Sequence, residues 1–347
     1  MPDEPVPAAD RRPDDAGQAS ARSRRRFLQG AGAAAVVGAG GFLGWRALAD
    51  GEGSGGSPGS GGNRVTPTPP PSSMADVVAY GAVGDGSTDD TAAFEAALAD
   101  SPYVYVPPGS YVLSRTLEIP ETTRLVGGGK YNTVLLHAHD DDFARLAARS
   151  SLAELSVEGQ GSVHSGRGLV LSGSDGQQSL QAVSVVDFDG YCIDFESPDA
   201  GSQFRATQVD VGRTGGDSGS ERYAVHISED QQLASVPRSF VQLETQGLCA
   251  IDFGGCNDTY VVASTLGDLR FTEESRGVNI SSSRLLNQES LTIAGHGITI
   301  VGCDIAPQLT IAPGADHVVL APNAFNRLPV IDRSGNDRHQ LPPDYGS

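Results

Sequence analysis

Short segments in the second half of the chain alternate apolar and polar residues and recur at similar intervals. Residues 291–294 and 309–312 share one such order and lie 18 positions apart. Residues 278–280, 298–300 and 318–320 repeat at intervals of 20 positions. Alternation with a period of two is typical of strands that bury one face. Recurrence at about this length indicates stacked turns, with glycine and asparagine expected at the corners. The pattern predicts a solenoid of short parallel strands around an apolar interior.

A helix is predicted over residues 89–99, before the repeats begin. Its apolar face consists of alanine together with Phe94 and Leu98, and Asp89 or Asp90 can cap its N-terminus. The open end of a solenoid leaves strand edges unpaired, which favours association with other chains. We therefore expect this helix to cover the N-terminal end of the solenoid.

Three motifs in residues 76–129 carry a family resemblance. Residues 76–94 read DVVAYGAVGDGSTDDTAAF, residues 104–111 read VYVPPGSY, and residues 123–129 read TRLVGGG. In this order they resemble the N-terminal signature of the pectate-lyase superfamily, which includes rhamnogalacturonases and phage tailspikes. The resemblance implies an all-β fold, a single-stranded right-handed parallel β-helix with an N-terminal capping helix.

The first residues of the chain resemble a twin-arginine export signal. Residues 23–28 read SRRRFL, a weakly apolar stretch follows over residues 30–45, and residues 47–49 (ALA) match a signal-peptidase site. The alternative is a basic tail beside a chance apolar segment. An export signal predicts an extracellular or cell-surface location, with membrane contact only through an uncleaved leader.

Composition sets the expected domain boundaries. Residues 50–73 are rich in glycine, serine, proline and threonine, which is typical of a linker. We expect a signal peptide over residues 1–49, this linker over residues 50–73, a β-helix domain over residues 74–326, and a polar tail over residues 327–347.

The charge balance and the cysteines restrict the partners. The chain has 24 basic and 43 acidic residues, a formal net charge of −19. A surface this acidic repels phosphate backbones, so we expect no nucleic-acid partner. The four cysteines lack the paired spacing of a zinc site. Cys249 and Cys256 could form a disulfide after export, or all four could be small core residues.

Four segments of the β-helix region read apolar, polar, apolar: residues 193–195, 225–227, 251–253 and 269–271. If their apolar residues point inward, their central residues point outward on one sheet. Neighbouring turns lie about 4.8 Å apart, so each central residue would be within reach of the next. The predicted site is this column: Asp194, His226, Asp252 and Arg270.

Two kinds of chemistry suit this column. Asp194 and Asp252 would lie about 10 Å apart at the backbone, and side-chain tilt could bring their carboxyls into the ~6.5–9.5 Å range of inverting glycosidases. In that case Asp252, flanked by His226 and Arg270, is the first choice for the base. Asp194, with one cationic neighbour, is the proton donor. The second option is a lyase in which Arg270 takes a proton from a uronate. The third is that these are solvated outward residues without catalytic function.

The sequence supports two classes of function. The first is a secreted polysaccharide-active enzyme, either a glycoside hydrolase or a polysaccharide lyase. The second is a non-catalytic glycan-binding or cell-surface structural β-helix, so enzymatic activity itself stays open. We expect a polysaccharide or cell-surface glycan as partner and no required cofactor, with calcium as an option. Residues 137–142 (HAHDDD) form a second polar loop that could bind a cation.

The export prediction is testable on the leader. Replacing Arg24 and Arg25 together by lysine should block secretion, because the paired guanidinium groups are the feature that defines the signal. Fractionation of cells producing the two-lysine variant and the parent chain measures this. Equal secretion of the two chains would contradict the prediction.

Overall fold

The computed structural model describes ten segments of the chain: residues 74–161, 163–172, 176–196, 203–212, 223–227, 237–246, 250–254, 257–286, 290–325 and 330–341. The predicted signal peptide and linker lie outside the described residues, as do Cys249 and Cys256. Cys192 and Cys303 are free and buried. Within the described part of the chain, no helix is long and apolar enough to cross a membrane.

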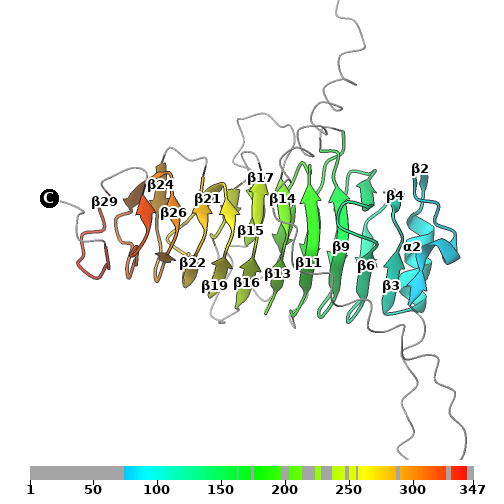
Figure 1. Cartoon of the computed structure of the whole chain (residues 1–347), viewed down its shortest axis with the longest axis horizontal. Coiled ribbons are helices and arrows are strands. Elements are labelled where there is room, and N and C mark those ends of the chain that lie inside the picture. Colours follow the sequence, from blue (N-terminus) through cyan, green and yellow to red (C-terminus); the bar gives the residue numbers. More distant parts are fainter. Residues whose placement is uncertain are drawn as a thin grey trace, which may run out of the picture. The chain divides into compact units, whose positions relative to one another are not determined.

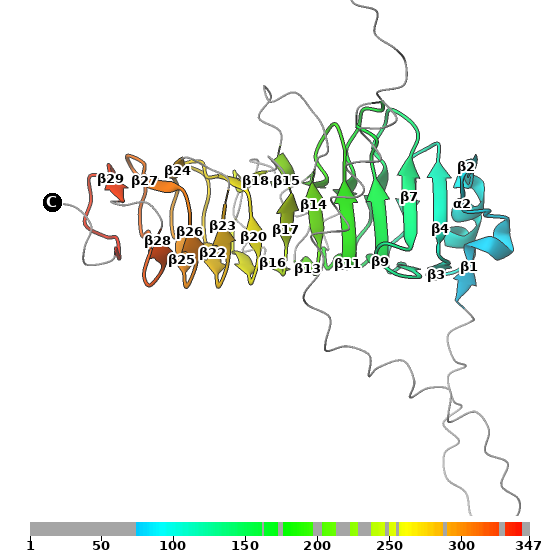
Figure 2. The same cartoon turned by 45° about the horizontal axis from the view of Figure 1, so that its top comes forward.

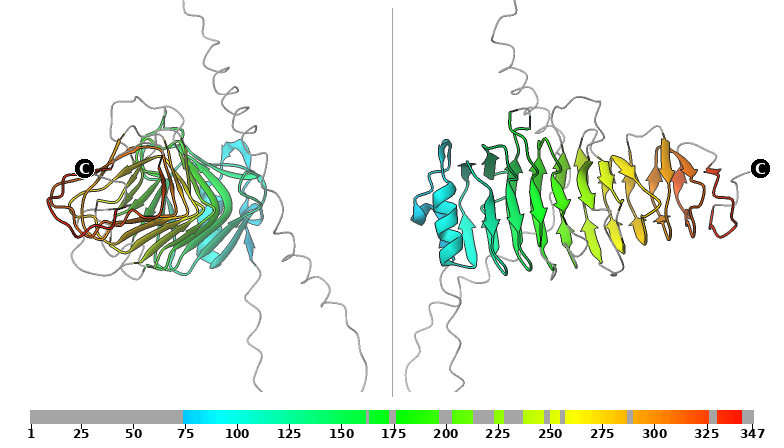
Figure 3. Two further views of the ribbon diagram at one scale, coloured as in Figure 1. Left: turned by 60° about the vertical axis from the view of Figure 1, so that its left-hand side comes forward. Right: turned by 180° about the vertical axis from the view of Figure 1, so that it is seen from behind.

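The described chain forms a parallel solenoid of about nine turns, which confirms the fold expected from the sequence. Figure 1 and Figure 2 show the strands of successive turns side by side, from α2 at one end to β29 at the other. Each turn contributes strands to three walls, and Figure 3 shows these walls enclosing a common interior. The strand pairings between turns are parallel in the described segments.

The largest sheet forms two of these walls. β9 (Ser151–Glu158) and β11 (Ser179–Val186) run through both walls without interruption. The first wall also contains β1 (Ala75–Asp76), β3 (Tyr103–Val106), β6 (Arg124–Gly127), β13 (Arg205–Thr207), β16 (Arg238–Val241), β19 (Thr259–Val262), β22 (Val278–Ser281) and β25 (Thr299–Val301). The second contains β2 (Asp85–Asp89), β4 (Gly109–Leu113), β7 (Thr133–His137), β14 (Asp210–Gly212), β17 (Glu244–Gln246), β20 (Thr265–Leu266), β23 (Arg284–Leu285), β26 (Asp304–Ile305) and β28 (Ala324–Phe325).

The third wall consists of two smaller sheets. Its seven-stranded sheet contains β5 (Leu117–Ile119), β8 (Ala144–Leu146), β10 (Leu169–Leu171), β12 (Ile193–Phe195), β15 (Tyr223–Ile227), β18 (Ala250–Asp252) and β21 (Asp268–Arg270). Its three-stranded sheet contains β24 (Ser290–Ile293), β27 (Gln308–Ile311) and β29 (Ile331–Asp332).

The register of the strands follows the repeats found in the sequence. Leu291 pairs with Leu309, and Ile293 pairs with Ile311. The 20-residue repeat is confirmed as well, because Ile280 pairs with Ile300. In the seven-stranded sheet the six apolar residues expected to point inward are all buried and lie in the core: Ile193, Phe195, Val225, Ile227, Ile251 and Phe253.

The N-terminal end is closed by the helix α2 (Thr91–Asp100), preceded by the short 3-10 helix η2 (Val77–Tyr80). Phe94 and Leu98 of α2 pack into the core, whereas Ala96 is exposed. The Asp89 carboxylate caps the helix by accepting from the Thr91 N–H at 3.0 Å. Asp90, the residue before the helix, instead accepts backbone N–H groups from the preceding loop, including that of Val83 at 2.6 Å.

The corner between the first and second walls has the same form in five turns. Two residues separate the strands there, of which the first has a positive φ and the second is buried. Glycine or asparagine was expected at such corners, but only one of the five is glycine. A left-handed conformation costs a non-glycine residue roughly 1–2 kcal/mol. The positive-φ residues are Gln208, Gln242, Ala263, Ser282 and Gly302.

Backbone hydrogen bonds hold these corners in place. The N–H of Gln208 donates to Val241 O one turn away, and the N–H of Gln242 donates to Val262 O, each at 3.0 Å. The buried second residue adds a side-chain bond in some turns, as when Ser264 Oγ accepts from the Leu243 N–H at 3.1 Å. The unfavourable conformation therefore persists because the stack of turns determines it on both sides.

The solenoid extends beyond the expected boundary at residue 326. β29 pairs with β27 through Thr310 and Ile331, and Gln340 forms a parallel bridge with Val319. The described part of the predicted polar tail, residues 330–341, is thus a further turn of the solenoid. Its polar composition reflects a turn at the end of the stack, where fewer side chains face the core.

Truncation of Phe253 tests the packing of the core. Phe253 is fully buried and stacks on Phe271 with ring centroids 5.2 Å apart. Phe253→Ala should lower the free energy of unfolding by about 3–5 kcal/mol because it leaves a cavity. Urea unfolding measures this, with Tyr260→Ala as control, since Tyr260 is 45% exposed and its loss should cost less than about 1 kcal/mol. Equal losses in the two variants would contradict the described core.

Candidate functional site

The outward residues of the seven-stranded sheet form one continuous column. Asp194 pairs in register with His226, His226 with Asp252, and Asp252 with Arg270. The predicted alignment of these four residues is therefore confirmed, although their catalytic role stays a prediction. Towards the N-terminal end the column continues through three further residues: Val170, Arg145 and Glu118.

Asp194 is one of the two nearly buried carboxylates of the column. Its side chain is only 4% exposed, and its two oxygens have different partners, His226 and Arg167. His226 Nδ1 lies 2.7 Å from Oδ1, and an Arg167 Nη1 hydrogen bond reaches Oδ2. The expectation of a single cationic neighbour for Asp194 is wrong, because Arg167 was not recognised. A carboxylate with donors on both oxygens is poorly suited to be a proton donor.

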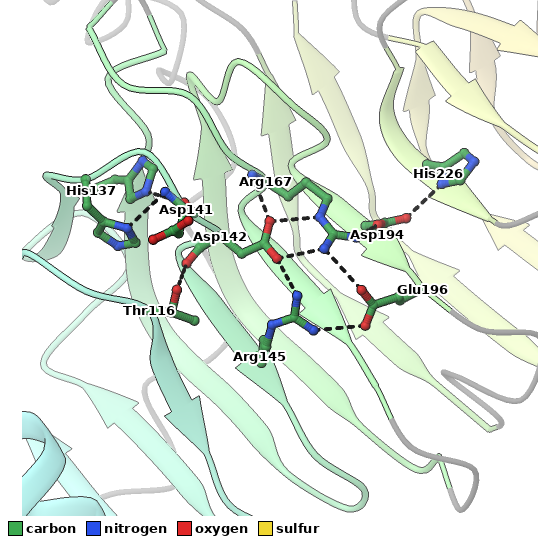
Figure 4. A network of polar contacts seen from close by, with 10 residues as sticks. Thr116, His137, Asp141, Asp142, Arg145, Arg167, Asp194, Glu196 and His226 are labelled. Carbon is green, nitrogen blue, oxygen red and sulfur yellow. Dashed lines mark hydrogen bonds and ion pairs between the residues drawn. The ribbon is translucent and has the colours of Figure 1, made fainter.

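His226 presents one ring nitrogen away from this pair. The Asp194 carboxylate accepts a hydrogen bond, so Nδ1 of neutral His226 carries the proton and Nε2 keeps its lone pair. Figure 4 shows the second ring nitrogen of His226 directed away from Asp194. The side chain is 21% exposed, and the ring of Tyr191 stacks on it with centroids 4.3 Å apart. This arrangement can accept a proton at Nε2 while Asp194 stabilises the resulting imidazolium.

Asp252 and Arg270 form the second pair of the column. Arg270 Nη1 donates to Asp252 Oδ2 at 2.8 Å, and the Gly254 N–H donates to Oδ1 at 2.9 Å. The Asp252 side chain is 3% exposed, whereas that of Arg270 is 39% exposed and lies near the Tyr223 ring. One of the three options left open was that these residues are solvated, and for Asp194 and Asp252 this is wrong. They point away from the core, but the neighbouring cations cover them.

Tyr191 connects the two pairs electrostatically. Burial raises the pKa of its hydroxyl, and the negative charges of Asp194 and Asp252 raise this pKa further. The positive charges of Arg270 and Arg167 act in the opposite direction without cancelling the rise. Tyr191 therefore stays neutral near pH 7 and contributes an aromatic face and a hydroxyl rather than a charge.

Arg167 belongs to an ion-pair network along the same wall (Figure 4). Its Nε and Nη2 atoms donate to the two oxygens of Asp142 at 2.8 and 2.7 Å, and Nη2 also donates to Glu196 at 3.1 Å. Arg145 joins the same two acids, at 2.7 Å from Asp142 and 3.0 Å from Glu196. Burial raises the pKa of Asp142, but the hydrogen bonds and charge of Arg167 outweigh this and leave it below its ordinary value.

The second polar loop contains a buried histidine. His137 is completely buried, and its ring nitrogens face two backbone carbonyl oxygens, Gly159 O at 3.1 Å and Asp141 O at 2.9 Å. Burial lowers the pKa of His137 below its ordinary value, although both carbonyls act to raise it. The loop was an alternative cation site. Among the described residues, no group of three or more His, Cys, Asp or Glu side chains is arranged to hold a metal ion.

Comparison with known proteins identifies a related N-terminal segment. Residues 74–152 match the family model described as rhamnogalacturonase A/epimerase, pectate lyase-like, which supports the superfamily suggested by the sequence motifs. The pre-neck appendage protein of Bacillus phage B103 is 49% identical over 59 residues, which are 17% of this chain and 7% of the phage protein. The chain therefore matches only a small part of that relative's length.

Solved structures with some likeness are more remote. The ORF18 protein of Geobacillus virus E2 aligns with 78% of this chain and 60% of its own, at 14% identity and a TM-score of 0.48. The A-module of the mannuronan C-5 epimerase AlgE6 from Azotobacter vinelandii aligns with 71% of this chain and 79% of its own, at 16% identity and a TM-score of 0.40.

The buried His137 predicts a pH dependence of stability. Because its pKa is lower in the folded state, the unfolded chain binds the proton first as the pH falls below about 6.5. Stability should thus be full above this pH and fall below it, by at most about 1.4 kcal/mol per pH unit for this one group. His137→Gln should be less stable at pH 7.5, yet lose less stability between pH 7 and pH 5.

Urea unfolding at several pH values measures how the free energy of unfolding changes with pH in the parent chain and in His137→Gln. His317→Asn is the matched control, because His317 is an exposed histidine with positive φ, a conformation that asparagine tolerates. This control removes an exposed histidine and its contact with Asp316, so a change of slope seen only in His137→Gln comes from the buried site. If His137→Gln kept the slope of the parent chain, burial of His137 would not be the cause of the pH dependence.

Proposed function

We propose that the protein is a polysaccharide-active enzyme in which His226, oriented by Asp194, acts as a general base. The observation that supports this is the hydrogen bond of His226 Nδ1 to a nearly buried carboxylate at 2.7 Å, with the ring itself partly exposed. A base of this kind typically accelerates a reaction by 10²–10⁴-fold. The match of residues 74–152 to a pectate-lyase-like family model favours a glycan as the substrate.

Elimination on a uronate suits this geometry better than hydrolysis. A glycosidase with two carboxyl groups needs one of them protonated, but Asp194 and Asp252 are each bonded to an arginine. In an elimination, His226 Nε2 would take the proton on C5, the electron pair would form the C4–C5 double bond, and the C4–O bond would break. The departing oxygen would take a proton from water. Arg270, 39% exposed beside the pair, would neutralise the substrate carboxylate.

A panel of neutral and uronate-containing polysaccharides tests the proposal. New reducing ends together with ultraviolet absorbance from an unsaturated uronate are expected with a uronate polymer, and reducing ends alone would indicate hydrolysis instead. His226→Gln should lower the rate at least about 100-fold because the base is lost. His317→Asn, a change far along the sequence from the column, should keep full activity. Calcium and a chelator are added in parallel, which shows whether the activity requires calcium.

The second candidate is a non-catalytic glycan-binding or surface-structural β-helix. It is favoured by the ion pairs of Arg145 and Arg167, which join acids from different turns and would stabilise the stack without any chemistry. Relatives named as phage appendage proteins share the N-terminal segment. If the folded protein produced neither new reducing ends nor ultraviolet absorbance with any polysaccharide of the panel, the enzymatic proposal would be overturned and this one supported. Export to the cell surface is part of both proposals.

A further inference from the structure

We propose that Arg167 is a positioning residue for the Asp194–His226 pair. It keeps Nδ1 of His226 bonded to the Asp194 carboxylate, so that Nε2 can accept a proton as a general base does. Arg167 contacts Asp194, and Asp194 contacts His226, so Arg167 would act through the carboxylate without touching substrate. The inference rests on the proposed function in one respect, namely that His226 is the base. The binding of a proton by His226, which the inference concerns, takes place in the protein whether or not a substrate is turned over.

Asp194 is nearly buried beside Arg167. Its side chain is 4% exposed, and its two oxygens are divided between His226 and Arg167. Arg167 places a positive charge beside this carboxylate, and its loss would raise the affinity of the Asp194–His226 pair for a proton, which binds at the more basic imidazole. With Arg167 in place, the Asp194 carboxylate accepts the Nδ1 proton of His226. This fixes the tautomer that leaves Nε2 free to accept a proton.

Arg167 is itself held rigidly. Its guanidinium makes two parallel hydrogen bonds to Asp142, at 2.8 and 2.7 Å, and a third to Glu196 at 3.1 Å. The loop that carries Asp142 is in turn fixed by Thr116 Oγ1, which donates to Asp142 O at 2.6 Å. A planar fork of donors is required for this geometry, which a lysine cannot reproduce. The position of the charge next to Asp194 is therefore determined by three strands of the wall and their loops.

Among the described residues, charges of both signs lie around His226. The carboxylates of Asp194 and Asp252 favour its protonated form, and Glu196 adds a more distant negative charge. The guanidinium groups of Arg167 and Arg270 oppose protonation, and Tyr191, stacked on the ring, is neutral. Loss of Arg167 removes one of the two opposing charges. His226 should then bind a proton more tightly, and less of it would be available as a base at neutral pH.

Nuclear magnetic resonance of the full chain with isotope-labelled histidine tests this directly. His226→Gln identifies the signal of His226. In Arg167→Gln we expect the titration midpoint of that signal to rise by about one pH unit, a tenfold tighter binding of the proton. The acidic limb of the activity profile should move in parallel wherever activity is found. Glu196→Gln is the matched control, because it also removes a partner of Arg167 but keeps the contact with Asp194. The titration midpoint of His226 in this control should equal that of the parent chain or lie slightly below it.

A second variant separates this effect from loss of structure. Arg167→Gln leaves the buried Asp142 with fewer partners, so the double variant Asp142→Asn with Arg167→Gln removes both charges of that pair. It should stay folded and still show a rise of the midpoint, smaller than in Arg167→Gln because the negative charge of Asp142 is lost as well. An unchanged or lower midpoint in the folded variants would overturn the positioning role. The titration needs no turnover. Absence of activity on the polysaccharide panel would therefore refute the proposed function without affecting the measured change in the His226 midpoint.

Discussion

The backbone hydrogen bonds between successive turns are the constraint on which the rest of this structure depends. Successive strands of the seven-stranded sheet pair in register, so the position of Ile193 determines those of Val225 and Ile251. The spacing of about 4.8 Å then brings Asp194 and His226 into contact without any dedicated loop. A slip of one residue would turn a charged side chain into the core, which makes the register energetically well defined.

Much of this register could be predicted from the sequence. Alternation around Asp194, His226, Asp252 and Arg270 identified the inward residues, and burial of those residues confirms the alignment. Periodicity reports on both faces of a strand, so it locates an outward column as reliably as a core. The helix at the N-terminal end was predictable for a similar reason, since its apolar face has helical spacing.

The surroundings of the column could not be predicted in the same way. Arg167 and Glu196 lie just outside the strands β10 and β12, where no alternation applies, and they reach Asp194 and Asp142 only in three dimensions. The burial of Asp194 was missed for the same reason. Arg270, which covers Asp252, was placed beside it by the alternation, but periodicity tells only that a side chain points outward and not how far its neighbour covers it.

The constant corner between the first and second walls has a consequence for how such a protein can change over evolution. In five turns, two residues connect these walls at the corner formed by Gln208, Gln242 and their equivalents. In contrast, the sequence separations between the aligned residues Ile193, Val225, Ile251 and Leu269 are 32, 26 and 18. Insertions and deletions are thus tolerated on the side of the molecule that borders the Asp194–His226 pair. New surfaces could arise there while the stack of turns stays unaltered.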